Sequence, residues 1–358
     1  MKALVLVGGT GTRPRPFGHA IQRQLVTVAN RPVLFFGLEA IRKSGISEIA
    51  IVVGKDDRAV RDAVGTGAAF GLDVTYIRQD AHLGLGHGVL IARDYLDGDD
   101  FLVLQDDSVI LDGIPRLVEE FRRSDRPEAM VMVGDVTGGG GRQTVVTVDG
   151  RGHVTGLKQG QGHPYFDRTL VGAYVFNPGV HQAILSTTPD WRRQREVTDV
   201  MAWLVANGGT VLAYSTKGYW NTLGCVDNLL DCNREVLSRL DPVVLGDVDD
   251  ASELLGPVLV DAGASIKGSR VVGPAVVGVG TTVTDSVIGP HTSLGADCDI
   301  QASAIEHSIV LERASLRAVG PVRNSLIGRD AQVWAEPAGS RLILGDRSQV
   351  ALPTGVVR

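Results

Sequence analysis

The sequence predicts two domains: an α/β domain with a doubly wound, mostly parallel sheet at residues 1–240, and a left-handed parallel β-helix of hexapeptide repeats at residues 241–358. In the first two-thirds of the chain, short β-branched runs alternate with amphipathic stretches, as expected of a Rossmann-like parallel sheet covered on both faces. Farther along, aliphatic residues recur six residues apart, which is the period of a β-helix. The length of 358 residues also exceeds one ordinary core.

The first domain is expected to begin with a buried strand. The apolar run from Ala3 to Val7 has no basic leader and is too short for a signal segment or a membrane span. A helix from Val226 to Leu240, closed by Asp241-Pro242, is the expected connector to the second domain. The other expected strands are 49–53, 74–77, 101–104, 130–133, 145–148, 171–176 and 211–214, and the other expected helices are 33–44, 58–63, 88–95 and 197–207.

The repeat pattern of the second domain becomes apparent beyond about Gly256, where glycine and small residues fill the intervals between recurring aliphatic residues. An ordinary sandwich would instead show turn signals about every 8 to 12 residues, together with hairpin dipeptides. Such solenoids mostly scaffold oligomers, so we expect a homo-oligomer and no chemistry in this half. The recurring residues are Val260, Ile266, Val272, Val277, Val283, Ile288, Leu294, Ile300, Val310 and Leu316.

Charge and cysteine content narrow the class of partner. A net charge of −6 and a pI near 5.8 give no bulk attraction to nucleic acid or to an anionic membrane. A phosphate-bearing small molecule would therefore need a local site. The three cysteines form neither a CxxC pair nor a zinc-type cluster, which favours the reduced cytoplasm.

A glycine-rich segment directly after the first strand is the strongest candidate for such a site. Glycines let consecutive backbone N–H groups approach phosphate oxygens, and an arginine adds fixed positive charge. The spacing is neither that of a P-loop nor GxGxxG, and a plain tight turn is the alternative interpretation. The residues are Gly8, Gly9, Gly11, Thr12 and Arg13.

Several motifs, in order along essentially the whole chain, resemble those of the sugar-1-phosphate nucleotidylyltransferases. The likeness is strongest to the long-form glucose-1-phosphate thymidylyltransferases of bacterial deoxysugar pathways. It rests on residues 8–13, 24–34, Gln79 with 83–87, 196–199, 231–234, 286–295 and 305–312.

The resemblance implies attack of a sugar-1-phosphate oxygen on the α-phosphorus of dTTP or UTP, with release of pyrophosphate. Residues 8–13 would hold the triphosphate, and Gln79, Gly84 and Gly86 would read the pyrimidine base. Asp106, which follows an apolar run, matches the first magnesium ligand. A carboxylate at the end of a strand suits a hard cation, although an ordinary turn aspartate is the plain alternative. Mg²⁺ is therefore the expected cofactor if the protein is active.

At the sugar-phosphate side, the chain departs from the family pattern. Thr144 stands where the family has a glycine, and the Glu-Lys pair that binds the sugar and its phosphate falls at Gln159 and Gly160. Gly172 is a further sugar-site position. Lys158, two residues before Gly160, is the nearest substitute cation.

The chain also departs from the family pattern at positions that the resemblance assigns to the metal and to the phosphates. Arg23 replaces the family's lysine and keeps the charge. The second metal-binding aspartate falls at Thr222, or at Asn221 if the match slips by one residue. Gln105 replaces a glycine and adds bulk, whereas Asp107 is a sideways substitute ligand.

Two hypotheses remain open from the sequence. The first is a working nucleotidylyltransferase that uses Arg13, Arg23 and Asp106 on a non-standard sugar or cyclitol phosphate. The second is a paralogue that binds a nucleotide or small metabolite and has a regulatory or different catalytic role in a specialised-metabolite pathway. His87 could contact a base or phosphate, although loop histidines of this kind are more often merely solvated.

Overall fold

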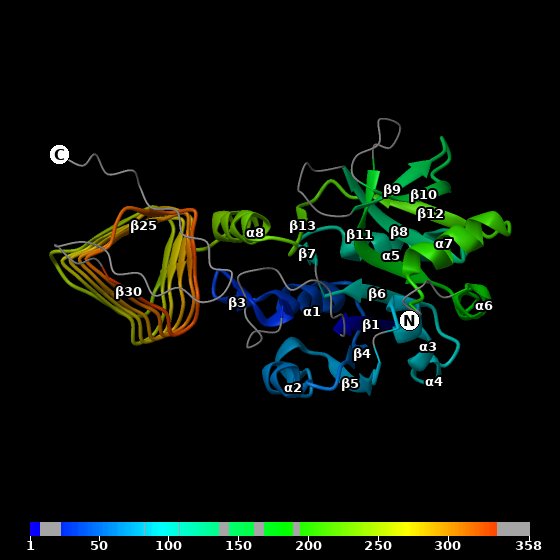
Figure 1. Ribbon diagram of the computed structural model, residues 1–358, viewed down its shortest axis with the longest axis horizontal. Helices are drawn as coiled ribbons and strands as arrows, with labels where there is room; N and C mark the ends of the chain where they lie inside the picture. Colours follow the sequence, from blue (N-terminus) through cyan, green and yellow to red (C-terminus); the bar gives the residue numbers. More distant parts are fainter. Residues whose placement is uncertain are drawn as a thin grey trace. The chain divides into compact units, whose positions relative to one another are not determined.

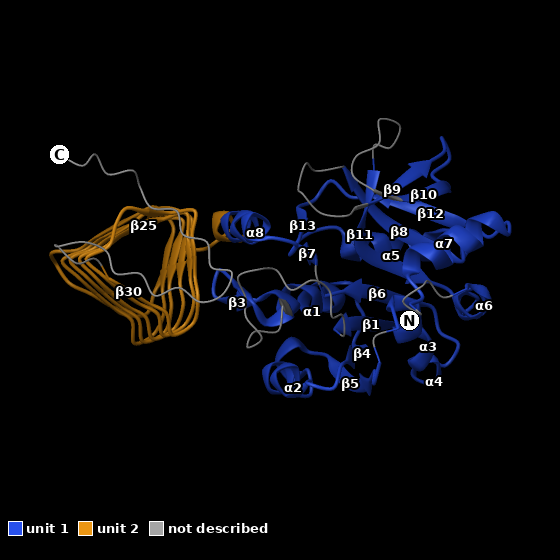
Figure 2. Ribbon diagram, in the orientation of Figure 1, with its two compact units in different colours: residues 1–14, 19–235 blue, residues 15–18, 236–358 orange. Residues whose placement is uncertain are grey.

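A computed structural model describes residues 1–7, 23–81, 83–106, 108–135, 143–160, 168–188 and 194–334. The described residues up to Glu235 form one compact unit, and those from Val236 onward form a second (Figure 2). The division falls inside helix α8 (Val226–Ser238), close to the predicted connector. A domain boundary between residues 240 and 241 stays a prediction.

The first unit is built on a nine-stranded sheet in the order β10-β9-β11-β6-β1-β4-β5, with β8 and β12 joined to it through β11. One half is parallel, as predicted. Its strands are β1 (Lys2–Val7), β4 (Glu48–Val53), β5 (Asp73–Arg78) and β6 (Phe101–Gln105). The central residues of β1, β4 and β6 are buried on both faces, which is why these three strands read as continuous apolar runs, whereas β5 at the edge of the sheet is only partly buried.

The other half of the sheet is more mixed than predicted. β11 runs antiparallel to β6, β8 and β9, and β10 runs antiparallel to β9. β12 is parallel to β8. The strands are β8 (Ala129–Asp135), β9 (Gln143–Val148), β10 (Val154–Gly160), β11 (Arg168–Phe176) and β12 (Val211–Ser215).

Helices cover both faces of this sheet, and a separate core lies under each layer (Figure 1). Val5 packs into one core with Leu38, and its neighbour Leu4 packs into the other with Val89, because successive strand residues point to opposite faces. One layer comprises α1 (Val33–Lys43), α2 (Arg58–Val64) and α5 (Ile114–Arg123), and the other comprises α3 (Leu85–Ile91), α4 (Arg93–Leu96), α6 (Val180–Ser186) and α7 (Val197–Ala206). The sequence analysis predicted neither α5 nor α6.

Short elements complete the first unit. The important pair is β7 (Ser108–Ile110) and β13 (Trp220–Thr222), which form a two-stranded antiparallel sheet of their own. The others are η1 (Arg23–Leu25), η2 (Ala68–Phe70), β2 (Thr27–Val28) and β3 (Arg31–Pro32).

The second unit is the predicted parallel β-helix, with three parallel sheets forming the sides of stacked coils (Figure 1). The first sheet contains β14 (Val243–Val244), β17 (Val258–Val260), β20 (Ala275–Val277), β23 (Thr292–Leu294), β26 (Ile309–Val310) and β29 (Leu326–Ile327). The second contains β15 (Asp247–Val248), β18 (Ser265–Lys267), β21 (Thr282–Thr284), β24 (Asp299–Gln301), β27 (Ser315–Arg317) and β30 (Gln332–Trp334). The third contains β16 (Glu253–Leu255), β19 (Arg270–Val272), β22 (Val287–Ile288), β25 (Ala304–Glu306) and β28 (Val322–Arg323). Its left-handedness stays a prediction.

The coil is shorter than the six-residue period predicts. Val260 pairs with Val277, and Val277 pairs with Leu294, so each of these coils takes 17 residues, one fewer than three complete hexapeptides; the next takes 16, since Leu294 pairs with Val310. Val271, not Val272 as predicted, is therefore the fully buried residue on the third side. Three sides of unequal length still let each backbone group pair with the coil above and below, which is the requirement of a solenoid.

Candidate functional site

The carboxyl ends of β1 and β6 meet at one edge of the parallel half of the sheet. Leu6 pairs with Gln105, so Val7 and Asp106 follow side by side. Ligands of such sheets bind beyond this edge. The predicted phosphate loop, Gly8 to Arg13, follows Val7 directly, but it lies outside the described residues, as does Asp107. The structure shows that Val7, the last described residue before this loop, lies beside Asp106.

The β7–β13 ladder brings the two predicted metal positions together. Thr222 is the direct partner of Ser108, which lies two residues beyond Asp106. The indole of the adjacent Trp220 fills the space over Gly134 of β8 and so fixes β13 against the large sheet. Thr222 therefore lies near the chain segment that carries Asp106, although the two are far apart in the sequence; metal binding at these positions stays a prediction.

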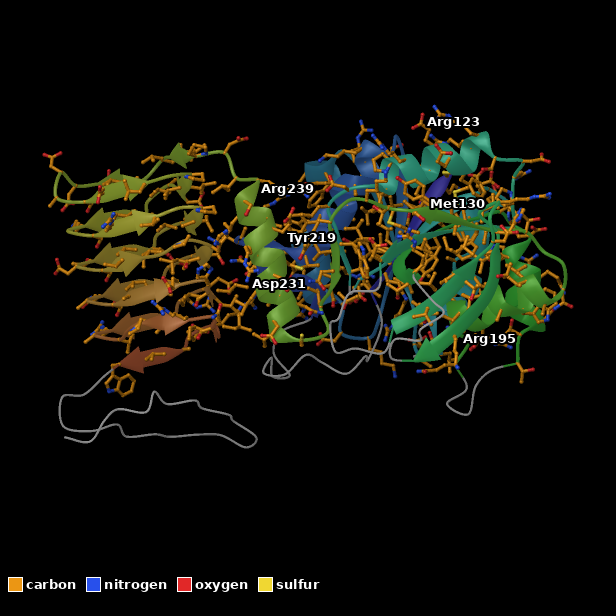
Figure 3. All side chains as sticks on the ribbon, turned by 90° about the horizontal axis from the view of Figure 1, so that it is seen from above. Arg123, Met130, Arg195, Tyr219, Asp231 and Arg239 are labelled. Atoms are coloured by element: carbon orange, nitrogen blue, oxygen red, sulfur yellow. The ribbon has the colours of Figure 1, made fainter. Side chains whose placement is uncertain are left out.

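Thr222 and Asn221 have different surroundings. The Thr222 hydroxyl is 3.3 Å from the Asn228 side-chain nitrogen, which also donates to the Thr222 carbonyl at 2.9 Å. Asn221 instead accepts from the Thr222 N–H and donates to the Tyr219 hydroxyl, and it lines a cavity of about 590 Å³ next to α8. Figure 3 shows Tyr219 beside this helix. Thr222 is thus the residue opposite Ser108, and it offers a hydroxyl already engaged with an amide instead of a carboxylate.

Gly172 adjoins this cluster from β11. Its φ of +90° lies at an irregularity in the pairing of β11 with β8. A Cβ atom there would come within 2.8 Å of the Ser108 hydroxyl and 3.0 Å of Gln105 Oε1. The Tyr174 hydroxyl also contacts Gln105 Oε1, at 3.4 Å. The bulky Gln105 side chain is therefore accommodated against β11 because residue 172 has no side chain.

The predicted base-reading residues lie at the same edge, after β5. The Gln79 side chain is only 6% exposed, and its Nε2 is 2.9 Å from His87 Nδ1. Burial, with a smaller contribution from the Arg195 guanidinium, holds the pKa of His87 below its usual value. The imidazole is accordingly neutral at physiological pH, and in the tautomer protonated on Nε2 its Nδ1 accepts a hydrogen bond from the amide.

Gly84 and Gly86 have a packing role that the sequence did not reveal. The Gly86 N–H donates to the Arg195 carbonyl and the Arg195 N–H donates to the Leu83 carbonyl, both at 2.8 Å. A Cβ on Gly84, whose φ is +88°, would lie 2.5 Å from the Arg195 carbonyl oxygen. The glycines thus let the loop before α3 dock on the Arg195 backbone. Contact of these glycines with a base stays a prediction.

The predicted sugar-site positions on β9 and β10 are neighbours. Thr144 pairs directly with Gln159, and the Thr144 carbonyl accepts a hydrogen bond from the Thr169 hydroxyl at 3.0 Å. Lys158 is exposed and shares a strand face with position 160, since residues two apart point the same way. The backbone of Arg23 begins η1, and the Arg23 side chain is not among the parts of the chain that the structure describes.

Ser108, Asn228 and Arg195 belong to this region but were missed by sequence reasoning. Ser108 and Arg195 contribute through contacts with residues distant in the sequence, and Asn228 through its contact with Thr222, six residues earlier; no local motif marks these contacts. Within the described residues, no group of three or more His, Cys, Asp or Glu side chains could hold a metal ion by itself. No helix in that part of the chain is long and apolar enough to cross a membrane.

Comparisons with known proteins agree with this fold. A family model described as nucleotidyl transferase matches residues 2–239. The chain is 46% identical over 355 residues to a glucose-1-phosphate thymidylyltransferase of Streptomyces griseus, covering 98% of this chain and 99% of the relative. It is 44% identical over 358 residues to the protein of the same name from Streptomyces antibioticus, with the same coverage. A solved UDP-glucose pyrophosphorylase shares the fold, with a TM-score of 0.59 and 17% identity over 66% of this chain and 98% of that one.

Proposed function

This chain belongs to the sugar-1-phosphate nucleotidylyltransferase family, and on that premise we propose that it transfers a nucleotidyl group from dTTP or UTP to a sugar-1-phosphate or a related phosphate. In this reaction a phosphate oxygen of the acceptor bonds to the α-phosphorus, the bond to the β-phosphate breaks, and pyrophosphate leaves. Such transfer depends on positioning and charge neutralisation, without a covalent enzyme intermediate.

The observation that carries the proposal is the convergence of Asp106, Ser108 and Thr222 at the edge where β1 ends. Mg²⁺ is usually held by one or two carboxylates together with substrate phosphates, so Asp106 with a bound triphosphate fits a magnesium site. When bound, the ion would supply charge neutralisation for the phosphates. Arg13 and the residues Gly8 to Thr12 are proposed to hold the triphosphate, with Arg23 as a further cation.

Glucose-1-phosphate itself is expected to be a poor acceptor. Gln159 and Gly160 provide neither the carboxylate for sugar hydroxyls nor the cation for the acceptor phosphate. Lys158 lies on the strand face of position 160, about 7 Å along the strand, which is within reach of an extended lysine side chain. We therefore assign Lys158 as the replacement cation, and this displacement favours an acceptor of a different shape.

A second candidate function is nucleotide binding without transfer. It is favoured by Thr222, whose hydroxyl is held by Asn228 and which contributes no charge. Loss of one electrostatic contact of this kind commonly lowers the rate by about 10² to 10³. In this case the nucleotide-binding half would be retained for a regulatory role.

Pyrophosphate release separates the two functions. The purified full chain would be incubated with Mg²⁺, each common nucleoside triphosphate and a panel of sugar-1-phosphates and cyclitol phosphates. The variants are Lys158→Met, Thr222→Asp and, as a matched surface control, Lys43→Met. Transfer predicts release with a pyrimidine triphosphate, a loss in Lys158→Met, an increase in Thr222→Asp and no change in Lys43→Met.

Two outcomes would contradict transfer. Absence of release with every pair of substrates, while dTTP or UTP still raises the melting temperature, would establish the binding function instead. Absence of both release and thermal stabilisation by any nucleotide would remove both candidates.

A further inference from the structure

Gln79 is held in one orientation by a single described side chain. Its amide is buried after the end of β5, and Nε2 is 2.9 Å from His87 Nδ1 on α3. A glutamine amide carries two hydrogens on nitrogen and an acceptor oxygen on the other side. Because the amide nitrogen that faces Nδ1 can only donate, the contact uses one of its two hydrogens, has Nδ1 as the acceptor and turns the amide oxygen away.

The position of His87 is itself fixed by tertiary packing. The loop that precedes it is joined to Arg195 by two backbone hydrogen bonds of 2.8 Å, from Gly86 and to Leu83. On the other side, a Cβ on Gly88 would approach Leu6 Cδ2 to 3.0 Å, so α3 lies close against β1. The imidazole therefore has little freedom to move away from Gln79.

From this arrangement we propose that His87 is a specificity-determining positioning residue: it orients the Gln79 amide so that the site accepts uracil and thymine and discriminates against cytosine. The inference rests on the proposed function, in which Gln79 reads a pyrimidine base.

The donor and acceptor patterns of the bases give the reason. Uracil and thymine carry an N3–H donor beside the O4 acceptor, whereas cytosine carries an N3 acceptor beside an amino donor. With one Nε2 hydrogen bonded to His87, Gln79 presents its oxygen for N3–H and its second hydrogen for O4. A reversed amide would exchange these two groups. It would present a hydrogen to N3 and its oxygen to the group at C4, which suits cytosine and leaves the N3–H of uracil or thymine without an acceptor, a costly arrangement in a buried site.

The proposal predicts a different effect for each of three substitutions at position 87. His87→Phe removes the acceptor, so the ratio of dCTP to dTTP dissociation constants should fall about tenfold. His87→Lys offers only donors and should reverse the amide and the preference. His87→Gln can again accept from Gln79 and should retain the ratio. His153→Phe, at an exposed histidine of the same unit that pairs with Asp149, is the control and should leave the ratio unchanged.

Dissociation constants for dTTP, UTP, dCTP and CTP would be measured by calorimetry with Mg²⁺ and the full chain, after circular dichroism has confirmed folding. An unchanged ratio in folded His87→Phe and His87→Lys, with dTTP still bound, would overturn the inference and leave the proposed function intact. Failure of the wild type to bind any pyrimidine triphosphate would instead contradict the proposed function.

A measurement on the wild type avoids any folding defect of the variants. With ¹⁵N-labelled histidine, His87 should show at pH 7.5 a neutral ring that carries its proton on Nε2, which leaves Nδ1 as the acceptor. A proton on Nδ1 would turn the Gln79 oxygen toward the histidine and would refute the proposed orientation.

Discussion

Substitution of Gly172 by alanine should disturb both stability and nucleotide binding, because Gly172 is where β11 adjoins Gln105, which precedes Asp106, and Ser108 of the β7–β13 ladder. Its φ is +90°, and a Cβ there would lie 2.8 Å from the Ser108 hydroxyl and 3.0 Å from Gln105 Oε1. Both neighbours are side-chain ends, so they can move, but Ser108 pairs through its backbone with Thr222. Its displacement would therefore reach the proposed metal position.

The size of the effect follows from two contributions. A left-handed conformation costs about 1–2 kcal/mol for a residue with a Cβ. The overlap adds the cost of overpacking, about 1–3 kcal/mol. Gly152 provides a matched control, since its φ is +86° and nothing lies within 4 Å of a Cβ built there. We expect Gly152→Ala to lose about 1–2 kcal/mol and Gly172→Ala about 2–5 kcal/mol of unfolding free energy.

The assay is urea denaturation followed by tryptophan fluorescence, to which Trp203 and Trp220 of the first unit contribute, together with calorimetric binding of Mg²⁺ and dTTP. Only Gly172→Ala should weaken binding. Equal losses of stability in the two variants, or unchanged dTTP affinity in Gly172→Ala, would refute the proposed contact between residue 172 and the site.

Three further predictions concern the rest of the molecule. In the β-helix, Ser286→Ala should lower stability by about 1–3 kcal/mol in urea denaturation, because the buried Ser303 N–H loses its partner, the Ser286 hydroxyl. Leu294→Ala, at a fully buried coil residue, should cost about 2–5 kcal/mol in the same experiment. Burial raises the pKa of the Cys232 thiol to about 12, so this thiol stays protonated at pH 8. After brief treatment with iodoacetamide, mass spectrometry should therefore find the exposed Cys225 modified before Cys232.

Much of the fold could be predicted because the signals are local. The inner parallel strands β1, β4 and β6 are largely uninterrupted apolar runs, and the β-helix repeats its aliphatic positions. β10 was missed because its Lys, Gln and Gly residues have weak strand propensity, and pairing with β9 stabilises it instead. α5 was missed although Gly113 and Pro115 mark its start. The exact coil length depends on which residues pair between successive coils, and the spacing of aliphatic residues along the sequence does not specify that pairing.

The candidate site could be predicted only in part, because only some of its residues are marked by local sequence motifs. Gln79, Asp106 and Thr222 could be placed from motifs, and the sheet and the β7–β13 ladder show how the last two come together. The contacts of His87 with Gln79 and of Gly84 with Arg195 depend on tertiary packing. No spacing within the chain encodes them, so the sequence indicated candidate residues but not how they are oriented.

The most direct test is calorimetric titration of dTTP into the full chain with and without Mg²⁺, for the wild type and Asp106→Asn. We predict that Mg²⁺ strengthens binding to the wild type, and that Asp106→Asn weakens the magnesium-dependent binding about tenfold or more and removes its dependence on the ion. Equal affinities in the two proteins under both conditions, or no binding to the wild type, would contradict a nucleotide site built around Asp106.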